Sequence, residues 1–322
     1  MAHVDPTAAR FQAVPSEAGH HESLYIKLCH PSEPLGAWIR YTVHKPPNAP
    51  PAGSLWFTLF EPGGPSVAKL TLPAPRSEPP DWLSVGEARI GPGVATGSIG
   101  AELSWELGFE SAEPALLHLP RAWMYTAPLP RTKLLSLAPA ARFHGRLTVD
   151  GRGLEVDGWR GMVGHNWGAE HAERWIWLHG LTEDGDWLDV AVARLKLGLV
   201  TTPWLAHGAL SLAGERHSLG GPGRKVEMDE SPSSCAFMLT GNGMRVRGSV
   251  SAPRERFVGW RYAGPNGSEH DVVNCSIADM RLAVERTSGG RSWELNVRGA
   301  AAYELGMRER DHGVPIQPFP DG

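Results

Sequence analysis

Side chains suited to ligand binding and proton transfer are concentrated in one segment, residues 161–180. Indoles offer a large apolar surface with one hydrogen-bond donor each, and imidazoles titrate near neutral pH. Together they are typical of an apolar pocket that contains a few placed polar groups. The segment therefore predicts one wall of a ligand site, and its indole, imidazole and carboxylate side chains are those of Trp167, Trp175, Trp177, His165, His171, His179, Glu170 and Glu173.

Each of these residues also has a purely structural interpretation. His165 and Asn166 could hydrogen-bond the backbone at a strand bend, as buried polar groups usually do. Tryptophans commonly pack in barrel cores, and charged residues such as Glu170 and Glu173 are commonly solvated between strands. The spacing of His165, His171 and Glu173 matches no strong metal-binding motif, so we expect no metal.

Composition excludes several classes of protein. The 322 residues are 41% hydrophobic and carry a net charge of -4 without a basic cluster, which argues against a nucleic-acid groove. The amino terminus lacks the apolar core of a signal peptide, and no apolar run approaches the length of a membrane span, so we expect a soluble cytoplasmic protein. The sequence has no Gly-rich phosphate loop between a strand and a helix, so we expect no nucleotide cofactor and no other cofactor. Three widely spaced cysteines, Cys29, Cys235 and Cys275, are expected to be buried apolar residues.

The elements that position the segment are expected to be β-strands. The 38 glycines and 28 prolines punctuate short aromatic and β-branched runs, and no long stretch has helical apolar spacing. Strands are predicted, among others, at residues 24–29, 37–44, 55–60, 122–125, 141–149 and 154–159, the last two joined by a short Gly-containing loop. Within residues 37–44, Ile39, Tyr41 and Val43 fall on one face, and the other face, which could line a polar-edged cavity, carries Trp38, Arg40, Thr42 and His44.

A second hairpin is predicted in register. Residues 174–182 and 187–195 are strand-like, and Asp184-Gly185 between them is a strong turn signal. This turn pairs Thr182 with Trp187 and Gly180 with Asp189. Directly opposed residues share a face, so one face is predicted to carry Trp175, Trp177, His179, Leu181, Leu188, Val190, Val192 and Arg194. The pattern leaves open which face meets the cavity.

Three stretches together resemble a known family. They are Arg-Leu-Thr-Val-Asp-Gly at residues 146–151, Trp-Arg-Gly-Met-Val-Gly-His-Asn-Trp-Gly at residues 159–168 and Trp-Ile-Trp at residues 175–177. They resemble the carotenoid 1,2-hydratase family, which belongs with the AttH-like proteins and the lipocalin-like Diels-Alderases. The resemblance covers about residues 20–200. It implies an all-β fold of two lipocalin-like antiparallel β-barrels in tandem, with an apolar substrate cavity. We expect an N-terminal tail at residues 1–19, one barrel at residues 20–198 and a second at residues 199–322, since the chain changes character after Lys196.

The sequence departs from this family at one position that matters for chemistry. The hydratases carry Tyr-His-Asp before the His-Asn-Trp-Gly core, and the Asp is their expected alkene-protonating acid. Here the aligned residues are Met162, Val163 and Gly164. Glu170 or Asp157 could substitute, because an apolar pocket raises the pKa of a carboxylic acid.

The resemblance and the residue types together give three classes of function. The first is an enzyme that hydrates, cyclises or isomerises an isoprenoid or polyketide-like molecule. Its catalytic residues would be His165, Asn166 and Glu170, and its substrate-binding residues Trp167, His171, Trp175, Trp177, His179 and Trp38. The second is a non-catalytic carrier of an apolar ligand, and the third is a scaffold whose barrels are filled with side chains. The expected partner is an apolar small molecule, and the oligomeric state stays open.

Overall fold

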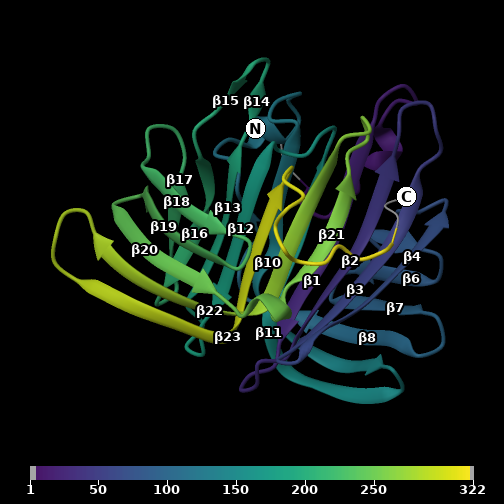
Figure 1. The fold of residues 1–322 in the computed structure, drawn as a ribbon, viewed down its shortest axis with the longest axis horizontal. Coiled ribbons are helices and arrows are strands. Elements are labelled where there is room, and N and C mark those ends of the chain that lie inside the picture. Colours follow the sequence, from purple (N-terminus) through teal and green to yellow (C-terminus); the bar gives the residue numbers. More distant parts are fainter. Residues whose placement is uncertain (1–4, 320–322) are drawn as a thin grey trace.

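The computed structural model describes residues 5–319, which form two large antiparallel sheets and three short 3-10 helices (Figure 1). The strands of the first sheet follow the order β4-β3-β2-β1-β11-β10-β8-β7-β6-β5, and β9 pairs with β10. Their bounds are β1 His20–Cys29, β2 Gly36–Lys45, β3 Ala52–Glu61, β4 Gly64–Pro73, β5 Leu83–Val85, β6 Ala88–Gly91, β7 Val94–Ile99, β8 Leu103–Glu110, β9 Leu116–Leu117, β10 Thr132–Val149 and β11 Arg152–Gly168.

The second sheet follows the order β17-β16-β13-β12-β23-β22-β20-β19-β18, with β21 paired to β22. Its strands are β12 Arg174–Leu181, β13 Trp187–Arg194, β16 Leu205–Leu212, β17 Glu215–Gly220, β18 Val226–Ser231, β19 Ser234–Gly241, β20 Met244–Ser251, β21 Val258–Ala263, β22 Glu269–Arg286 and β23 Ser292–Met307. A separate hairpin joins β14 Lys196–Leu197 and β15 Val200–Thr201, and the 3-10 helices are η1 Phe11–Ala13, η2 Ala122–Tyr125 and η3 Arg254–Arg256. The prediction of an all-β fold is confirmed.

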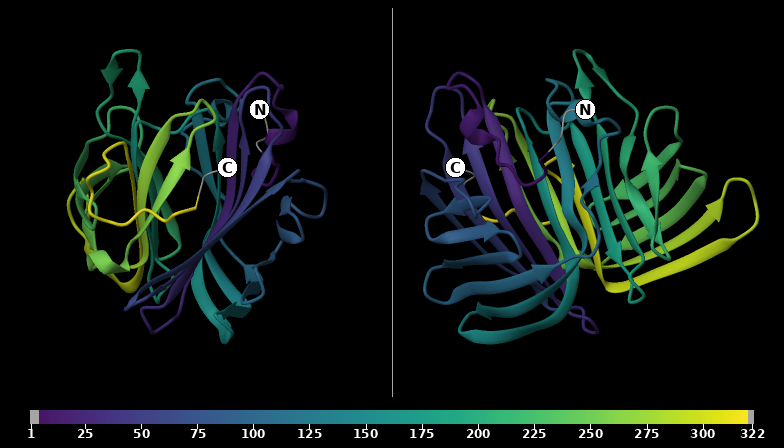
Figure 2. Two further views of the ribbon diagram at one scale, coloured as in Figure 1. Left: turned by 45° about the vertical axis from the view of Figure 1, so that its right-hand side comes forward. Right: turned by 180° about the vertical axis from the view of Figure 1, so that it is seen from behind.

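The two sheets lie side by side, and strand β22 of the second packs against β1, β2 and β3 of the first (Figure 2). Hydrogen bonds join the two sheets here: the Lys27 ammonium donates to the Ala300 carbonyl oxygen, and the Cys29 thiol donates to the Ser276 carbonyl oxygen over 3.1 Å. The outer face of β1, β2 and β3 is therefore buried rather than solvated. Any cavity left at this junction is lined by both sheets.

The alternation along β2 explains how one strand serves two cores. Ile39, Tyr41 and Val43 pack inside the first sheet, as the sequence predicts. Trp38 points the other way and belongs to the core of the second sheet. Because successive side chains of a strand point to opposite faces, apolar residues on both faces indicate a strand with a layer on either side.

The β10–β11 hairpin confirms the predicted short Gly-containing loop. Val149 pairs with Arg152, which leaves Asp150 and Gly151 as the two-residue turn. Both turn residues have positive φ, 52° and 74°, as a type I′ turn requires. Asp is among the residues that tolerate this conformation, and Gly adopts it without a steric cost.

Two local predictions are wrong. Residues 122–125 form the 3-10 helix η2 instead of a strand, because the turn closes on itself through bonds from Met124 N to Arg121 O and from Thr126 N to Trp123 O. The β12–β13 register is shifted by one residue, so that Leu181 pairs with Trp187.

The cause of the register shift is a five-residue loop at the hairpin tip. Thr182 donates its N–H to the carbonyl oxygen of Asp186, and its hydroxyl accepts the N–H of Asp186 over 3.1 Å. Thr182 therefore belongs to the loop and not to the ladder. A shift of one residue moves a whole strand face to the other side, and here it places Asp189 opposite His179.

The sheets also divide the chain earlier than the expected boundary after residue 198. The first sheet ends at Gly168, and the second begins at Arg174. The hairpin of residues 174–194 pairs with β23 and β16 and so completes the second sheet. Long-range pairing of this kind leaves no local signal. A tail was expected at residues 1–19, of which 1–4 lie outside the described residues; residues 5–19 include η1, and Phe11 is buried in the first core.

Candidate functional site

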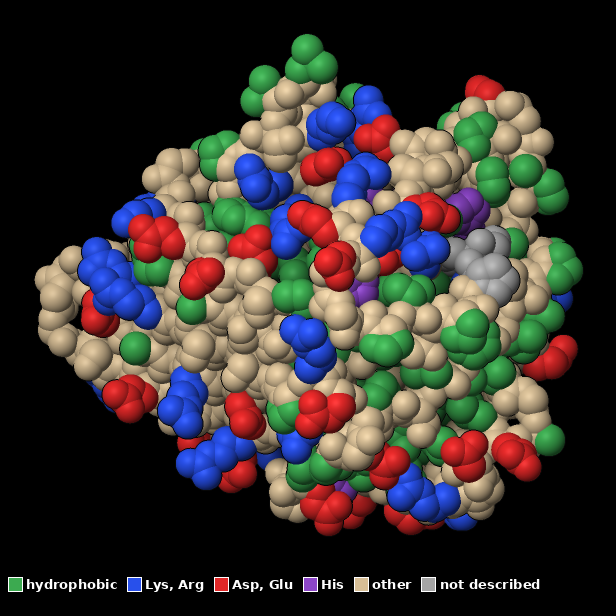
Figure 3. Space-filling view, in the orientation of Figure 1, with side chains coloured by type: hydrophobic (Ala, Val, Ile, Leu, Met, Phe, Trp, Pro, Cys, Tyr) green, Lys and Arg blue, Asp and Glu red, His purple; other side chains and the backbone are tan. Residues whose placement is uncertain are grey.

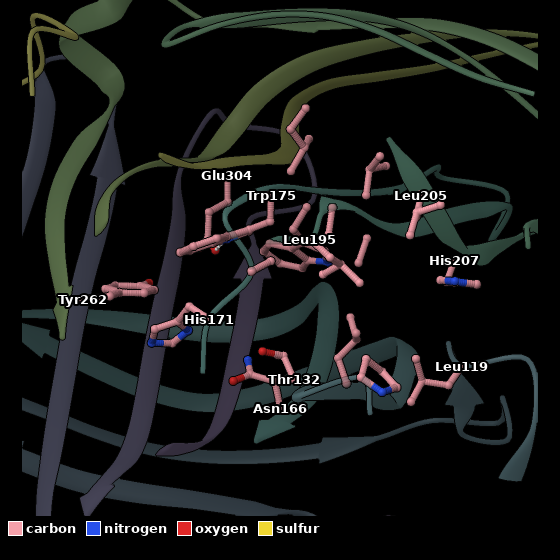
Figure 4. A pocket seen from close by; sticks show the side chains of 18 of the residues that line it. Leu119, Thr132, Asn166, His171, Trp175, Leu195, Leu205, His207, Tyr262 and Glu304 are labelled. Atoms are coloured by element: carbon pink, nitrogen blue, oxygen red, sulfur yellow. Dashed lines mark hydrogen bonds between the residues drawn. The ribbon is translucent and has the colours of Figure 1, made fainter. Parts of the chain in front are cut away.

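A cavity of about 260 Å³ lies between the outer face of the first sheet and the β12–β13 hairpin (Figure 4). Its walls are mostly apolar and include Trp38 from β2, Trp175 and Trp177 from β12, and Leu205 from β16. The segment around η2 closes another side, with Leu119 and Met124. An apolar cavity with a few polar groups is the usual form of a small-molecule site.

The β12–β13 hairpin makes room for the cavity by pairing large residues with small ones. Trp177 lies opposite Ala191, and Trp175 lies opposite Ala193. All four line the cavity. The opposite face of the hairpin, with Ile176, Leu178, Val190 and Val192, packs in the core of the second sheet. The indole face therefore supplies most of the hairpin residues that line the cavity, which the strand pattern alone left open, and Ile176 and Val192 of the other face also border it.

The Tyr25 ring fills the space beside Gly164, the position where the resemblance to the hydratases leads one to expect an acid. A Cβ atom at position 164 would overlap Cζ of Tyr25, which comes from the neighbouring strand β1 and pairs with Gly164. Tyr25 lines the cavity, and its hydroxyl makes no hydrogen bond within residues 5–319. Burial, with the charges of Asp189 and Glu304, raises the pKa of Tyr25 well above 10, so the hydroxyl stays protonated and can donate.

Gly164→Ala is expected to lower the free energy of unfolding by about 1–3 kcal/mol, because an added methyl group in a packed site displaces the Tyr25 ring. Urea denaturation measures the loss. Gly63→Ala is the matched control, since nothing lies within 4 Å of a Cβ there. In a Tyr25→Ala background the cost of Gly164→Ala should shrink, and an unchanged cost would show that the two residues are not coupled.

A fully buried carboxylate, Asp189, fixes the Trp177 wall. Trp177 Nε1 donates to Asp189 Oδ1 over 3.1 Å, and Ser136 Oγ of the first sheet donates to Oδ2 over 2.5 Å. Nε2 of His118 lies 3.5 Å from Oδ1. Burial alone would raise the pKa of Asp189, but the neighbouring His118 charge, together with hydrogen bonds, lowers it to about 2. Asp189 therefore stays ionised and holds the indole in place.

A second carboxylate, Glu304 of β23, lines the cavity directly. Its oxygens accept hydrogen bonds from Trp175 Nε1 over 2.9 Å and from Asn274 Nδ2 over 3.0 Å. Both Glu304 oxygens thus already have donors from the protein. Asn166 also lines the cavity, and its side-chain amide makes no hydrogen bond within residues 5–319.

The end of the cavity near His171 contains a ring of aromatic residues around Arg40. His171 lies beside Trp175, His21 and Tyr262, with centroid distances of 5.6, 4.1 and 5.9 Å. A smaller cavity of about 30 Å³ adjoins this end and shares Arg40, His171 and Tyr262 with the larger one. Burial, followed by the charges of His21, His270 and Arg40, lowers the pKa of His171 well below 6.5, so the ring is neutral at pH 7.

The structure brings five of the nine sequence-predicted residues to the cavity. They are Trp38, Asn166, His171, Trp175 and Trp177. Trp167 instead packs with Leu119, Tyr125 and Leu135. His179 is fully buried and bonded from Nε2 to the Pro139 carbonyl oxygen over 2.9 Å.

His165 lies on the opposite face of β11 from Asn166 and forms a buried pair with Glu22. His165 Nε2 donates to Glu22 Oε1 over 2.8 Å, and Nδ1 lies 2.9 Å from the Pro6 carbonyl oxygen. The Glu22 carboxylate also accepts the backbone N–H groups of Arg10 and Phe11. The pair therefore anchors the N-terminal segment over the mouth of the first barrel and does not line the cavity.

Neither proposed replacement for the missing acid reaches the cavity. Glu170 is hydrogen-bonded to Arg131 at the surface, where its side chain is 36% exposed. Asp157 is exposed on β11. Among residues 5–319, no group of three or more His, Cys, Asp or Glu side chains could hold a metal ion.

Four residues that the sequence did not predict also line the cavity: Tyr25, Tyr262, Glu304 and His207. Arg40 had a signal, because the alternation along β2 puts it beside Trp38 on the face predicted to line a cavity. Tyr25 sits on the same face of β1, and a consistent alternation across β1 and β2 could have found it. Tyr262 and Glu304 arrive from strands far along the chain and have no local signal.

Exposed apolar side chains lie on the hairpin that connects two residues of the cavity wall, Leu195 and Leu205. Leu197, Val200 and the wholly exposed Leu199 form the β14–β15 hairpin, between the lining residues Leu195 and Leu205. Hydrophobic side chains are visible at its tip (Figure 3). Within the part of the chain that the structure describes, no helix has the length and apolar character needed to cross a membrane.

Comparison with known proteins supplies the family. No family model matches the chain. The uncharacterized protein Rv0493c of Mycobacterium tuberculosis strain H37Rv is 30% identical over 296 residues, which are 90% of this chain and 87% of that protein, and the protein MT0513 of strain CDC 1551 matches equally.

The same fold is found in solved structures of much lower identity. An AttH-like protein, NE1406 of Nitrosomonas europaea, has a TM-score of 0.57 at 13% identity, covering 94% of this chain and 99% of that chain. Kievitone hydratase of Nectria haematococca has a TM-score of 0.57 at 12% identity, covering 93% and 90%. CghA, solved with Sch210972, has a TM-score of 0.60 at 11% identity, covering 90% and 88%. The chain thus has the tandem lipocalin-like barrel fold and belongs to the family of Rv0493c of Mycobacterium tuberculosis.

Proposed function

We propose that this protein binds an apolar, isoprenoid or polyketide-like small molecule in the cavity between its sheets and promotes a cyclisation or isomerisation of it. The observation that carries the proposal is the cavity itself: about 260 Å³ lined by Trp38, Trp175 and Trp177, with small residues opposite the hairpin indoles. Two structural neighbours, kievitone hydratase and CghA with its bound Sch210972, support a small-molecule site in this fold.

The polar groups of the cavity suit hydrogen bonding better than protonation of an alkene. The Tyr25 hydroxyl and the Asn166 amide are available to donate to a carbonyl oxygen of the ligand. The Tyr25 hydroxyl is a very weak acid, since burial raises its pKa. Shape alone can supply much of the rate of a ring closure by holding the reacting ends together. The resemblance to the carotenoid 1,2-hydratases implies an acid that hydrates an alkene, but Gly164 has no side chain that could act as this acid.

A carrier without catalysis is the second candidate. The observation that favours it is that the carboxylates already accept hydrogen bonds from the protein. Glu304 accepts from Trp175 and Asn274, and Glu170 accepts from Arg131. No carboxylic acid in the described part of the cavity is left without a protein donor.

Filling the cavity tests the binding site. Long-chain apolar polyenes should quench tryptophan fluorescence and raise the melting temperature of the wild type. Ala191→Leu, which extends a side chain into the cavity beside Trp177, should weaken binding at least about tenfold. Ala236→Leu on the exposed face of β19 is the control for the same substitution. Equal binding by the two variants would place the site elsewhere.

Product analysis separates an enzyme from a carrier. If the protein is catalytic, Tyr25→Phe and Asn166→Ala should each slow turnover by about 10²-fold, as the loss of a placed donor does. Glu170→Gln should leave turnover unchanged because Glu170 lies at the surface. Binding without any product from the wild type would favour the carrier.

A further inference from the structure

Arg40 is a buried cation whose hydrogen-bonding groups are only partly used. Its side chain lies on β2, and the residue is 7% exposed. Nε donates to the Ser23 hydroxyl over 3.0 Å, while Nη1 is buried and has no hydrogen-bond partner within the described residues. Arg40 forms no ion pair with a carboxylate in residues 5–319. A buried charge is ordinarily paired or hydrogen-bonded, because its removal from water is costly.

Aromatic rings hold the guanidinium in place without satisfying it. Its Cζ atom lies 4.4 Å from the ring centroid of Tyr262, 5.1 Å from that of Trp38 and 5.3 Å from that of Trp56. Cation–π contacts act on the face of the guanidinium, whereas its N–H groups point outward in its plane. The rings therefore fix its orientation and leave its donors for an acceptor.

Among residues 5–319, the ionisable groups that line the two cavities beside Arg40 are either neutral or bonded to other partners. Burial, with smaller contributions that include the Arg40 charge, keeps His21 and His171 neutral at pH 7. Glu304, the carboxylate that lines the larger cavity, accepts bonds from Trp175 and Asn274. Glu22, which lines the smaller cavity, is the partner of His165.

Arg40 lines both the larger and the smaller cavity, at the point where they share Tyr262 and His171. Figure 4 shows Tyr262 and His171 together at one end, with Leu119 and Leu205 toward the other. The cavity thus has a cation at one end, and the rest of its wall is mostly apolar. Planar, bidentate donors of this kind match a carboxylate.

We propose that Arg40 is an anion-binding group and that the natural ligand carries a carboxylate at one end of an apolar body. This inference rests on the proposed function, since it assigns the ligand class of the same cavity. The carboxylate occupies the Arg40 end, and the apolar body extends along Trp175 and Trp177 toward Leu205.

Matched acids and alcohols test the inference: retinoic acid against retinol, and dodecanoic acid against dodecanol, titrated by tryptophan fluorescence at pH 7.5. The wild type should bind at least one acid about tenfold more tightly than its alcohol, as one well-placed charge-assisted bond gives. Arg40→Met should abolish the preference and keep alcohol binding. Arg281→Met, at an exposed arginine of β22, should leave the preference intact.

The outcomes separate the two proposals. Equal binding of acids and alcohols by the wild type, or a preference that survives in Arg40→Met, would overturn the anion site and leave the proposed function standing. Binding of none of the four probes would count against the cavity as a ligand site altogether. If Arg40→Met fails to fold, Arg40→Lys takes its place: it retains the charge without the planar fork, and a preference as large as that of the wild type would contradict a bidentate role.

Discussion

Replacing Glu22 with glutamine is expected to lower the free energy of unfolding by about 3–5 kcal/mol, because it leaves several buried donors without their charged acceptor. Glu22 and His165 are both fully buried and joined over 2.8 Å. Every group that contacts the carboxylate donates to it, including the backbone N–H groups of Arg10 and Phe11. A glutamine amide would turn its own donor toward these donors.

The same substitution is expected to release the N-terminal segment. The two backbone bonds to Glu22 tie down residues 10 and 11, and Phe11 then packs in the first core. Urea denaturation measures the stability, and limited proteolysis before Phe11 measures the release. Glu17→Gln, an exposed glutamate in the same segment, is the control. A Glu22→Gln variant as stable as the control would mean that the pair contributes nothing.

The second large effect is a loss of stability in mild acid, expected to begin near pH 6.5. Burial, the main cause in each case, lowers the pKa of His21 to about 3, of His179 to about 4 and of His270 to about 4. It also lowers the pKa of His171 well below 6.5. In the folded protein these rings are neutral, whereas in the unfolded chain the histidines become protonated below about pH 6.5.

The sign follows from proton linkage. Between pH 6.5 and about 4 the unfolded chain binds more protons than the folded one, so stability falls as pH falls. By pH 5, each of these histidines lowers the free energy of unfolding by on the order of 1–2 kcal/mol. Glu22 and Asp189 add a second loss at lower pH, from about 4.5 down to about 2, because their pKa values are lowered to about 2 in the folded state.

Urea denaturation at pH 7.5, 6.5, 5.5 and 5.0 measures this dependence. His179→Gln should flatten the curve between pH 6.5 and 5, because the amide can still donate to the Pro139 carbonyl but does not titrate. His144→Gln removes an exposed imidazole and is the control. A wild-type stability that is constant over this pH range would contradict the burial of neutral histidines.

The sequence predicted the strands with clear alternation and the tight turns with clear chemistry. Residues 37–44 gave both faces of β2, and Asp150-Gly151 gave a hairpin whose two turn residues have positive φ. The register of the β12–β13 hairpin could not be predicted in this way. Asp184-Gly185 located the turn, but the Thr182–Asp186 bonds that lengthen the loop are formed by a side chain and a carbonyl, and no hydrophobic pattern contains them.

That single-residue shift decided part of the candidate site. With the predicted register, Leu188 and Val190 would have shared the face of Trp177, and Asp189 would have been on the other side. The observed register puts Asp189 beside Trp177 and the small Ala191 and Ala193 opposite the indoles. The cavity and the carboxylate that orients its wall both depend on it.

By itself the sequence determined the all-β fold, the concentration of indoles and imidazoles in residues 161–180, and the lack of the expected acid at Gly164. These depend on composition, alternation and local turns, which are properties of neighbouring residues. Only the tertiary structure decided which of these side chains meet. It set His165 against Glu22 and away from the cavity, put the Tyr25 ring into the space beside Gly164, and enclosed Arg40 among Trp38, Trp56 and Tyr262. The physical reason is that each of these contacts joins residues from different strands, and strand pairing and sheet packing fix such contacts only when the whole chain has folded.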